Sequence, residues 1–377
     1  MEFLIQAWLN LTWIDIVKCV AMWVIGGVLI FLAIKKEMEP ALLLPIGFGA
    51  ILVNIPGTNV LTTADGTGII EWLFQVGIEA SEALPILLFI GIGAMIDFEP
   101  LITNPKLMIL GAFAQLGIFL TITLAVLLGF PLNDAASIGI IGAADGPTSI
   151  LVAMKLHSNY IGPIMVVAYS YMALVPIIQP AVIKLCTTKK ERLIRMDYTG
   201  TKVSKTVKIL FPIVVTVVSG CIAPASLALI GFLMFGNLIK ECGVLGSLAD
   251  TAKNQLANLI TLLLGITIAF QMQADKFLSL ETLMIMALGL AAFCIDTFGG
   301  IMCAKVINLF SKKKINPMVG AAGISAFPMS ARVVHKMGLA EDNTNYLLMH
   351  AVGANVSGQI ASAVVGGLII GLVGGIF

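Results

Sequence analysis

Charged residues are scarce in this sequence, and their scarcity excludes a water-soluble protein. Asp, Glu, Lys and Arg make up 11% of the 377 residues, whereas an average soluble domain has about 25%. Apolar residues make up 59% of the chain, and the mean hydropathy is +1.02. The apolar runs are far longer than the roughly ten-residue alternating strands of a membrane barrel. We therefore expect an all-α polytopic membrane protein, whose helices satisfy the backbone polar groups inside the bilayer.

Residues typical of several other functions are also missing. The six cysteines lie mostly in or beside apolar runs, without the CxxC spacing of metal or redox sites. His157, His335 and His350 are scattered and form no metal or triad pattern. There is no Gly-rich phosphate loop, and no basic cluster interleaved with aromatic residues, so no nucleic-acid partner is expected. The N-terminus lacks a basic segment and a small-residue cleavage site, so no cleaved signal peptide is expected.

Twelve apolar runs can cross or enter a bilayer. They cover residues 15–34, 41–55, 83–98, 107–130, 136–159, 161–185, 209–221, 222–239, 256–273, 281–308, 315–338 and 344–376. Eight of the 22 basic residues lie between Lys184 and Lys208, and the positive-inside rule places such a segment in the cytoplasm. The stretch 56–82 has acidic residues but no Lys or Arg, which favours the outer side.

Twelve full crossings contradict this orientation, because the basic segment would then lie outside. The contradiction disappears if 136–159 is a re-entrant hairpin entered from outside and 315–338 is one entered from the cytoplasm. We therefore predict a first repeat over 1–185, a basic cytoplasmic loop over 186–208 and a second repeat over 209–377. Each repeat has about five spans and one hairpin, and an odd number of spans inverts the second repeat relative to the first.

Short segments recur between the two halves at a nearly constant spacing. Residues 40–48 match residues 224–232 at six of nine positions. The tripeptides that start at 107 and 142 recur at 283 and 320, so the three offsets are 184, 176 and 178. Inverted repeats are typical of transporters, whose binding sites lie near the bilayer midplane where broken helices meet.

The first predicted hairpin contains a carboxylate in the middle of an apolar run. Asp145 would cost about 2.5–3.5 kcal/mol at the bilayer centre unless it were compensated. Gly146 and Pro147 break the helix beside it and free backbone carbonyls near the hydroxyl of Thr148. Such a set of oxygens suits a small hard cation. The alternative is that Asp145 pairs with a structural Lys or Arg, although none lies near it in the sequence.

The second hairpin supplies neutral oxygens and one permanent positive charge. Asn316 and Ser325 provide the oxygens, and Gly320 is one of several residues that mark a break. Arg332 carries a planar guanidinium that matches a carboxylate. The alternative is that Arg332 acts only as a cytoplasmic charge that orients the protein.

Further polar residues lie in two predicted spans. Asn355 and Gln359 belong to a polar stripe in the last span, which either lines a site or packs helices through small residues. Tyr171 in the span 161–185 is either a site residue or an aromatic anchor at the membrane interface. The residues alone therefore indicate a sodium- or proton-coupled transporter and leave its energy source open.

Four stretches resemble the β subunit of sodium-pumping, biotin-dependent decarboxylases: GAADGPTSI (142–150), AYSYMALVPIIQP (168–180), NPMVGAAGISAFPMSARV (316–333) and HAVGANVSGQIASAV (350–364). The resemblance covers essentially the whole chain, and the family includes the oxaloacetate, methylmalonyl-CoA, glutaconyl-CoA and malonate enzymes. It implies that the chain takes carboxybiotin from a partner, decarboxylates it, consumes a cytoplasmic proton and exports sodium. The chain is short for the oxaloacetate group, which favours an acyl-CoA decarboxylase.

The resemblance also implies roles for individual residues. Asp145 would be the principal sodium carboxylate, Ser325 would serve a second sodium or proton site, and Gly320 would set the geometry of the hairpin tip. Tyr171 and Arg332 would serve proton delivery and carboxybiotin binding. We therefore predict catalytic roles for Arg332, Tyr171 and Ser325, and a sodium site formed by Asp145, Thr148, Asn316, Gly320, Ser325, Asn355 and Gln359.

The implied partners are a carboxyltransferase α subunit, a biotin carrier protein and a small membrane γ or δ subunit. The biotin is expected on a partner, because the sequence has no soluble carrier domain and no Met-Lys-Met acceptor. We expect a homo-oligomer in the cytoplasmic membrane of a bacterium or archaeon. The competing interpretation is a secondary transporter, either a sodium/proton antiporter or a sodium-coupled carboxylate transporter. A purely structural anchor is disfavoured by Asp145.

Overall fold

The computed structural model describes residues 8, 11–58, 60–61, 66–80, 82–197 and 203–375. Every secondary-structure element in these ranges is a helix. Seven helical stretches are long and apolar enough to cross a membrane, and there are eight if the bent pair Ile69–Glu79 and Ala83–Met95 is one span. The seven are Trp13–Lys35, Leu107–Leu127, Ile161–Cys186, Lys205–Ile222, Gly246–Met272, Leu280–Phe310 and Leu348–Gly374. The prediction of an all-α polytopic membrane protein is therefore confirmed.

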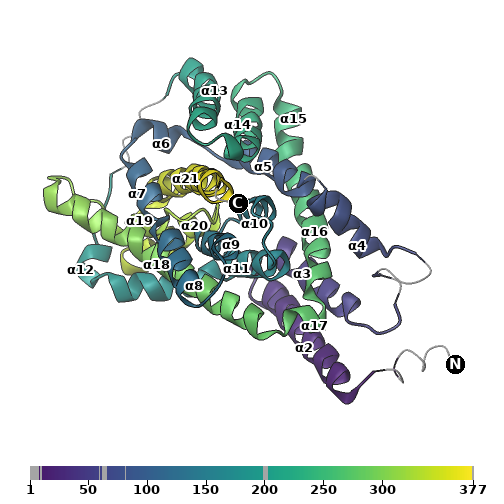
Figure 1. Cartoon of the computed structure of the whole chain (residues 1–377). Coiled ribbons are helices and arrows are strands. Elements are labelled where there is room, and N and C mark those ends of the chain that lie inside the picture. Colours follow the sequence, from purple (N-terminus) through teal and green to yellow (C-terminus); the bar gives the residue numbers. More distant parts are fainter. Residues whose placement is uncertain are drawn as a thin grey trace.

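The helices follow one another in two series, and the second begins with a short helix of the basic segment (Figure 1). The first series comprises α2 (Trp13–Lys35), α3 (Pro40–Val53), α4 (Ile69–Phe74), the π-helical turn η1 (Gln75–Glu79), α5 (Ala83–Met95), α6 (Glu99–Thr103), α7 (Leu107–Phe113), α8 (Leu116–Leu127), α9 (Leu132–Gly139), the 3₁₀ turn η2 (Ile140–Ala143), α10 (Gly146–Lys155) and α11 (Ile161–Cys186).

The second series comprises α12 (Lys189–Arg192), α13 (Lys205–Ile222), the 3₁₀ turn η3 (Pro224–Ser226), α14 (Leu227–Glu241), α15 (Gly246–Asp250), the π-helical turn η4 (Thr251–Leu256), α16 (Ala257–Ile268), the 3₁₀ turn η5 (Ala269–Met272), α17 (Ala274–Phe277), α18 (Leu280–Phe310), α19 (Pro317–Ala321), α20 (Met329–Glu341) and α21 (Leu348–Gly374). A π-helical turn thus interrupts the third apolar stretch of each series.

Capping residues and prolines account for where several helices begin. Thr12 caps α2 in a reciprocal capping box with Asp15. Ser204 and Ser279 accept hydrogen bonds from backbone N–H groups in the first turns of α13 and α18. Pro40 is the first residue of α3, where its missing N–H costs no helical hydrogen bond. These four helix starts are therefore encoded locally in the sequence.

Some boundaries differ from those predicted. Helix α13 begins at Lys205, so the end of the predicted loop 186–208 is helical, because Ser204 caps it. Helices α3 and α14 have 14 and 15 residues, fewer than the roughly 20 that cross a bilayer at 1.5 Å per residue. Parts of the acidic stretch 56–82 and of the predicted loop 186–208 lie outside the described residues, namely 59, 62–65, 81 and 198–202.

Two pairs of short helices, each in contact within the pair, occupy the segments predicted to be hairpins. Hairpin one (Leu132–Lys155) consists of α9, η2 and α10, and hairpin two (Pro317–Glu341) consists of α19 and α20. They begin and end within four residues of the predicted ranges 136–159 and 315–338. Their tips touch, because the N–H of Ser325 donates a hydrogen bond to the carbonyl of Ala143, with N and O 3.0 Å apart.

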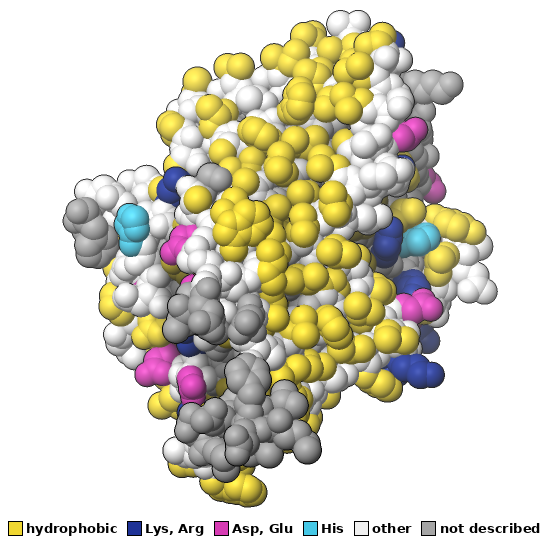
Figure 2. Space-filling view, turned by 90° about the vertical axis from the view of Figure 1, so that its right-hand side faces the viewer, with side chains coloured by type: hydrophobic (Ala, Val, Ile, Leu, Met, Phe, Trp, Pro, Cys, Tyr) yellow, Lys and Arg dark blue, Asp and Glu magenta, His cyan; other side chains and the backbone are white. Residues whose placement is uncertain are grey.

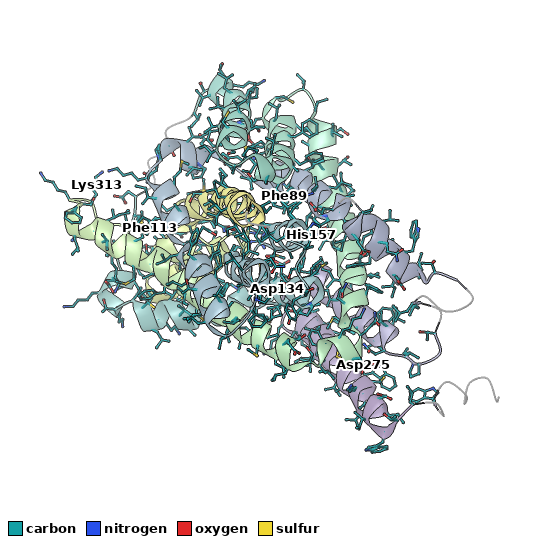
Figure 3. All side chains as sticks on the ribbon, in the orientation of Figure 1. Phe89, Phe113, Asp134, His157, Asp275 and Lys313 are labelled. Carbon is teal, nitrogen blue, oxygen red and sulfur yellow. The ribbon has the colours of Figure 1, made fainter. Side chains whose placement is uncertain are left out.

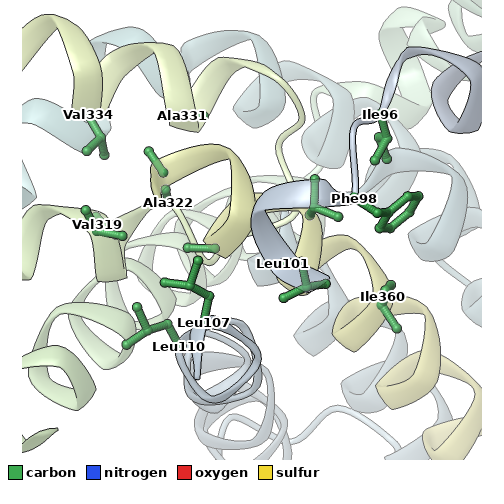
Figure 4. Close-up of a cluster of buried hydrophobic side chains, with 14 of the residues drawn as sticks. Ile96, Phe98, Leu101, Leu107, Leu110, Val319, Ala322, Ala331, Val334 and Ile360 are labelled. Atoms are coloured by element: carbon green, nitrogen blue, oxygen red, sulfur yellow. The ribbon is translucent and has the colours of Figure 1, made fainter. Parts of the chain in front are cut away.

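The hairpins lie among the central helices, as Figure 1 shows for α9, α10, α20 and α21. Helix α10 packs against α11 and α21, and α20 packs against the same two helices. The largest buried apolar cluster joins hairpin two to α7 and α21 (Figure 4). In it, Leu107 and Leu110 lie with Val319, Val334 and Ile360. The core of the protein is therefore built around the hairpins.

A second group of helices packs beside this core. Helix α3 contacts α2 and α16, while α14 contacts α13 and α5. Helices α5 and α14 approach so closely that a Cβ atom at Gly93 or Gly236 would overlap a backbone carbonyl oxygen of the other helix. Small residues permit such close backbone contact in membranes, where packing must hold helices together.

Large apolar side chains cover the outside of the molecule. Figure 2 shows a broad band of hydrophobic side chains, with charged side chains towards its two edges. Phe31, Leu127 and Val217 are each more than half exposed in this structure. Asp275 and Lys313, which flank α18 in the sequence, lie on opposite sides of the view in Figure 3. An apolar surface of this extent is typical of a multi-pass membrane protein.

Candidate functional site

Asp145 lies where the backbone of hairpin one changes direction. The 3₁₀ turn η2 ends at Ala143, Ala144 adopts a left-handed conformation with φ of 52°, and Asp145 is extended. Gly146 and Pro147 then form the first two residues of α10, positions at which a proline is tolerated. The predicted helix break is thus present, and it places the Asp145 carboxylate at the N-terminal end of a helix, where negative charge is stabilised.

Neutral donors from two helices surround the Asp145 carboxylate. Its Oδ2 accepts hydrogen bonds from Thr148 Oγ1 at 2.7 Å, Ser362 Oγ at 2.9 Å and Gln359 Nε2 at 3.0 Å. Asp145 is only 3% exposed, and all three partners are buried. Among the described residues, no Lys or Arg nitrogen lies within 4.0 Å of Asp145. The alternative interpretation, in which Asp145 pairs with a structural Lys or Arg, therefore has no support among the described residues.

Residues of hairpin two and α21 lie next to this cluster. Ser325 Oγ donates a hydrogen bond to the carbonyl of Gly358 at 3.0 Å. Asn355 Nδ2 donates to the carbonyl of Ile324 at 2.6 Å. The amide oxygen of Asn355 is buried and has no hydrogen-bond partner among the described residues. An unpaired buried acceptor is costly, and a bound cation would satisfy it.

Two residues of the predicted sodium set lie elsewhere in this structure. Asn316 caps α19, and its Nδ2 donates hydrogen bonds to the carbonyls of Arg192 and Ile194 at 2.9 and 2.8 Å. Gly320 lies against Gly300 of α18, and a Cβ atom at Gly320 would overlap the Gly300 carbonyl. The structure therefore brings together Asp145, Thr148, Ser325, Asn355 and Gln359, and it places Asn316 and Gly320 along the first arm of hairpin two.

The two tyrosines of α11 have different surroundings. Tyr171 donates its hydroxyl hydrogen to the carbonyl of Met286 at 2.5 Å, on the side of α18. Tyr169 is fully buried, and a Cβ atom at Gly146 would collide with its ring. The Tyr169 hydroxyl has no partner among the described residues. Tyr169, rather than Tyr171, therefore lies against the backbone at Asp145.

Arg332 is an exposed residue in the first turns of α20. Its backbone N–H donates to the carbonyl of Pro328, one turn from the hairpin tip. Among the described residues it has no acidic partner within 4.0 Å. Its guanidinium therefore remains available to an anion.

A cavity of about 160 Å³ reaches Asp145. Its polar lining comes from α16, α21, the two hairpin tips and the start of α3, and includes Glu39, Asp145, Asn258, Thr261, Ser325 and Gln359. Tyr169 and Pro328 also line it. The cavity is large enough to admit a small cation and several waters.

The prediction from the sequence missed two residues of the cluster. Ser362 was not selected, although it lies three residues after Gln359 and seven after Asn355, on the same face of α21. Tyr169 was not selected, because the resemblance to the decarboxylase family implied a role for Tyr171 and the residues alone did not distinguish the two tyrosines. Helical spacing was enough to find Ser362, whereas only the packing of α11 distinguishes the two tyrosines.

The chemistry of the cluster favours a hard cation. One carboxylate, three hydroxyls and two side-chain amides offer oxygen ligands, and no soft sulfur ligand is among them. A buried carboxylate without a positive partner is unfavourable. A small cation that binds there would neutralise it.

Comparison with known proteins agrees with this chemistry. Residues 18–373 match the family described as "Na+-transporting oxaloacetate decarboxylase beta subunit". The chain belongs to this family. It is the membrane subunit of a sodium-pumping decarboxylase, and the function predicted from the sequence is confirmed.

Named relatives cover nearly the full length of the chain. The methylmalonyl-CoA decarboxylase subunit beta of Propionigenium modestum is 48% identical, covering 94% of this chain and 95% of its own. The glutaconyl-CoA decarboxylase subunit beta of Acidaminococcus fermentans is 47% identical, with 94% and 93% covered. The oxaloacetate decarboxylase beta chain of Klebsiella pneumoniae is 42% identical, with 93% and 94% covered.

Proposed function

We propose that this subunit decarboxylates carboxybiotin delivered by a partner and couples the reaction to sodium export through Asp145. The observation that carries the proposal is the buried Asp145 carboxylate, held by Thr148, Gln359 and Ser362 and by no positive group among the described residues. On binding, sodium would contact the carboxylate in place of the hydrogen bonds that these three side chains now donate to it. The lone pairs of Thr148 and Ser362 and the amide oxygen of Gln359 would turn towards the ion, and Asn355 Oδ1 would complete the site.

Charge neutralisation gives the coupling a physical form. An empty site leaves a negative charge on the tip of hairpin one, and a bound sodium cancels it. A neutral tip can change its exposure between the two membrane faces at a lower cost than a charged one. Each sodium moved outward against 100 mV costs about 2.3 kcal/mol. The free energy of a favourable decarboxylation can therefore drive the export of one or two sodium ions.

Arg332 would hold the carboxylate of carboxybiotin, because it is exposed, unpaired and one turn from the tip of hairpin two. A guanidinium binds a carboxylate through two parallel hydrogen bonds. Tyr171 and Ser325 would take part in delivery of the cytoplasmic proton. Ser325 contacts hairpin one through its backbone, so it is placed to respond to movement there. Asn316 and Gly320 would act by fixing the first arm of hairpin two.

We propose further that the two halves, 1–185 and 209–377, are inverted repeats joined by the cytoplasmic segment 186–208. Two observations support this proposal. The order of elements repeats, with a π-helical turn in each half, and helices of one half pack against helices of the other half in equivalent pairs. Helix α3 packs on α16 as α14 packs on α5, and α21 packs on α7 as α11 packs on α18.

Cysteine labelling tests this topology. In a cysteine-free background, a single cysteine at Asn133 should react with an impermeant thiol reagent added outside. A cysteine at Lys313 should react only from inside. Labelling of both cysteines from one face would contradict the inverted repeat, but it would not bear on the proposed sodium site.

The proposed partners are a carboxyltransferase α subunit, a biotin carrier protein and a small membrane γ or δ subunit, with this chain as a homo-oligomer in the cytoplasmic membrane. The substrate of the complex is proposed to be an acyl-CoA, because identity is 48% and 47% to two acyl-CoA decarboxylase subunits and 42% to an oxaloacetate one. Co-purification should recover a biotinylated protein that avidin recognises. A secondary antiporter or carboxylate transporter would recover none.

Substitution of Asp145 tests the proposed site. Asp145→Asn keeps the size of the side chain but removes its charge, so sodium-dependent decarboxylation by the complex should be lost while the protein still folds. The control is Asp275→Asn, the same change at an exposed residue paired with Lys18. Wild-type sodium dependence in a folded Asp145→Asn protein would refute the assignment.

A further inference from the structure

The loop that joins α2 to α3 holds a glutamate in an unusual backbone conformation. Glu39 has φ of 38° and ψ of 59°, in the left-handed region. Residues with a Cβ atom rarely adopt this conformation, and it is associated with functional sites. Pro40 follows as the first residue of α3. The loop therefore holds Glu39 at the start of α3 in a strained backbone conformation.

Glu39 lines the same cavity as Asp145. Asn258 and Thr261 of α16 line it too, while Ser325 and Gln359 belong to the part formed by hairpin two and α21. The cavity therefore contains two carboxylates. Asp145 lies on hairpin one, and Glu39 lies at the start of α3, which packs against α16. In the proposed topology the α2–α3 loop faces the cytoplasm.

The charge of Glu39 is not cancelled by a direct ion pair. Among the described residues no Lys or Arg nitrogen lies within 4.0 Å of its carboxylate. Burial raises the pKa of Glu39, and attraction to the Arg332 guanidinium counteracts part of that rise. Glu39 is thus a partly buried acid that lines the cavity and is attracted by the Arg332 guanidinium.

We propose that Glu39, together with the neutral oxygens of Asn258 and Thr261, forms a second cation-binding position that receives sodium from the cytoplasm before it reaches Asp145. This inference rests on the proposed function, since it assumes that Asp145 binds sodium. A carboxylate inside a cleft with apolar walls raises the local concentration of cations and their rate of entry. Glu39 acts on access, whereas Asp145 sets the final binding.

The test compares two neighbouring glutamates in the complete complex, reconstituted into vesicles. Glu39→Gln removes the charge and keeps the size of the side chain. Glu37→Gln is the matched control, because Glu37 lies in the same loop, is exposed, also has a positive φ of 51° and does not line the cavity. The sodium concentration that gives half-maximal decarboxylation should rise roughly threefold to tenfold in Glu39→Gln and stay unchanged in Glu37→Gln.

A second measurement separates this proposal from the sodium site itself. Protection of the complex against thermal unfolding by saturating sodium should persist in Glu39→Gln, because Asp145 is intact, and should be lost in Asp145→Asn. Equal sodium dependence in Glu39→Gln and wild type would overturn the role of Glu39 alone. A shift of the same size in Glu37→Gln would also overturn it, because loop charge in general would then explain the effect. Persistent protection in Asp145→Asn would overturn the proposed sodium site instead.

Discussion

The two hairpins have similar shapes but differ in where they place charge. Hairpin one has its carboxylate, Asp145, at the tip, where the residues around it are buried. Hairpin two has neutral residues at its tip and places Arg332 one turn further, on an exposed face of α20. In the proposed function this contrast corresponds to two roles: Asp145 of hairpin one would bind a cation inside the protein, and Arg332 of hairpin two would bind the carboxylate of carboxybiotin.

The bases of the hairpins differ as well. At hairpin one, buried Asp134 accepts hydrogen bonds from Ser158 Oγ at 2.7 Å and from the backbone N–H of Asn159 at 2.8 Å. At hairpin two, Glu341 and Asp342 form ion pairs with Arg192 and Arg195 at 2.6 and 2.7 Å. The basic segment therefore binds the base of hairpin two through two ion pairs.

The largest expected effect tests how tightly hairpin two is held. In Gly320→Ala the new methyl group would overlap the Gly300 carbonyl of α18, so backbone must move. Overpacking of this kind costs about 3 kcal/mol, and thermal unfolding of the purified protein should report it. The control is Gly371→Ala in α21, where nothing lies within 4 Å of the added Cβ. Equal unfolding temperatures in both variants would show that α19 can move away from α18 without cost.

The next effect concerns the exposed charge of hairpin two. Arg332→Lys keeps the charge and loses the bidentate geometry. Turnover of carboxybiotin should fall by a factor that corresponds to about 1.5–3 kcal/mol, the value of a charge-assisted hydrogen bond. Sodium protection against thermal unfolding should be unchanged, since Asp145 is intact. Unchanged decarboxylation would favour the alternative in which Arg332 only orients the protein.

A smaller effect compares the two bases directly. Asp134→Ala leaves the buried hydroxyl of Ser158 and the partly buried backbone N–H of Asn159 without their acceptor, which costs about 1–3 kcal/mol. Glu341→Ala breaks a partly exposed ion pair with Arg192, which costs about 1 kcal/mol or less. Denaturation of both variants measures the difference. A larger loss in Glu341→Ala would mean that ion pairs, rather than buried hydrogen bonds, hold a hairpin more firmly.

The sequence was sufficient to predict the parts of the molecule that depend on local signals. Gly146 and Pro147 indicated the helix break at Asp145. The entry of the two hairpins from opposite membrane faces, inferred from the distribution of charge, stays a prediction. The cluster around Asp145 was only partly predictable, because its partners on α21 come from more than 200 residues away. Glu39 was not predicted, since a glutamate in a loop is ordinary in a sequence and becomes notable only when the loop lines a cavity.

Asn316 shows a different limit. Its position before Pro317 and its amide are compatible with both a sodium ligand and a helix cap. In this structure its amide oxygen accepts the N–H of Met318, and its nitrogen bonds to the carbonyl of Arg192. Sequence patterns identify the functional groups of a side chain, but competition between partners is decided by tertiary packing.

The smallest expected effect lies at the base of hairpin two and depends on pH. Hydrogen bonds from Thr344 and the ion pair with Arg195 lower the pKa of Asp342 from its ordinary 3.8 to about 2. Because the pKa of Asp342 is lower in the folded state, its ionised carboxylate stabilises the folded protein at every pH above the ordinary pKa. This stabilisation disappears as the pH falls from about 3.8 to about 2. Asp342→Asn should therefore lower the unfolding temperature slightly near neutral pH. The difference from wild type should shrink as unfolding is measured at successively lower pH below about 4. The pair is exposed, so high salt should also reduce the difference. A difference that grows towards acid pH would mean that Asp342 is protonated in the folded protein, and that Arg195 does not hold hairpin two through it.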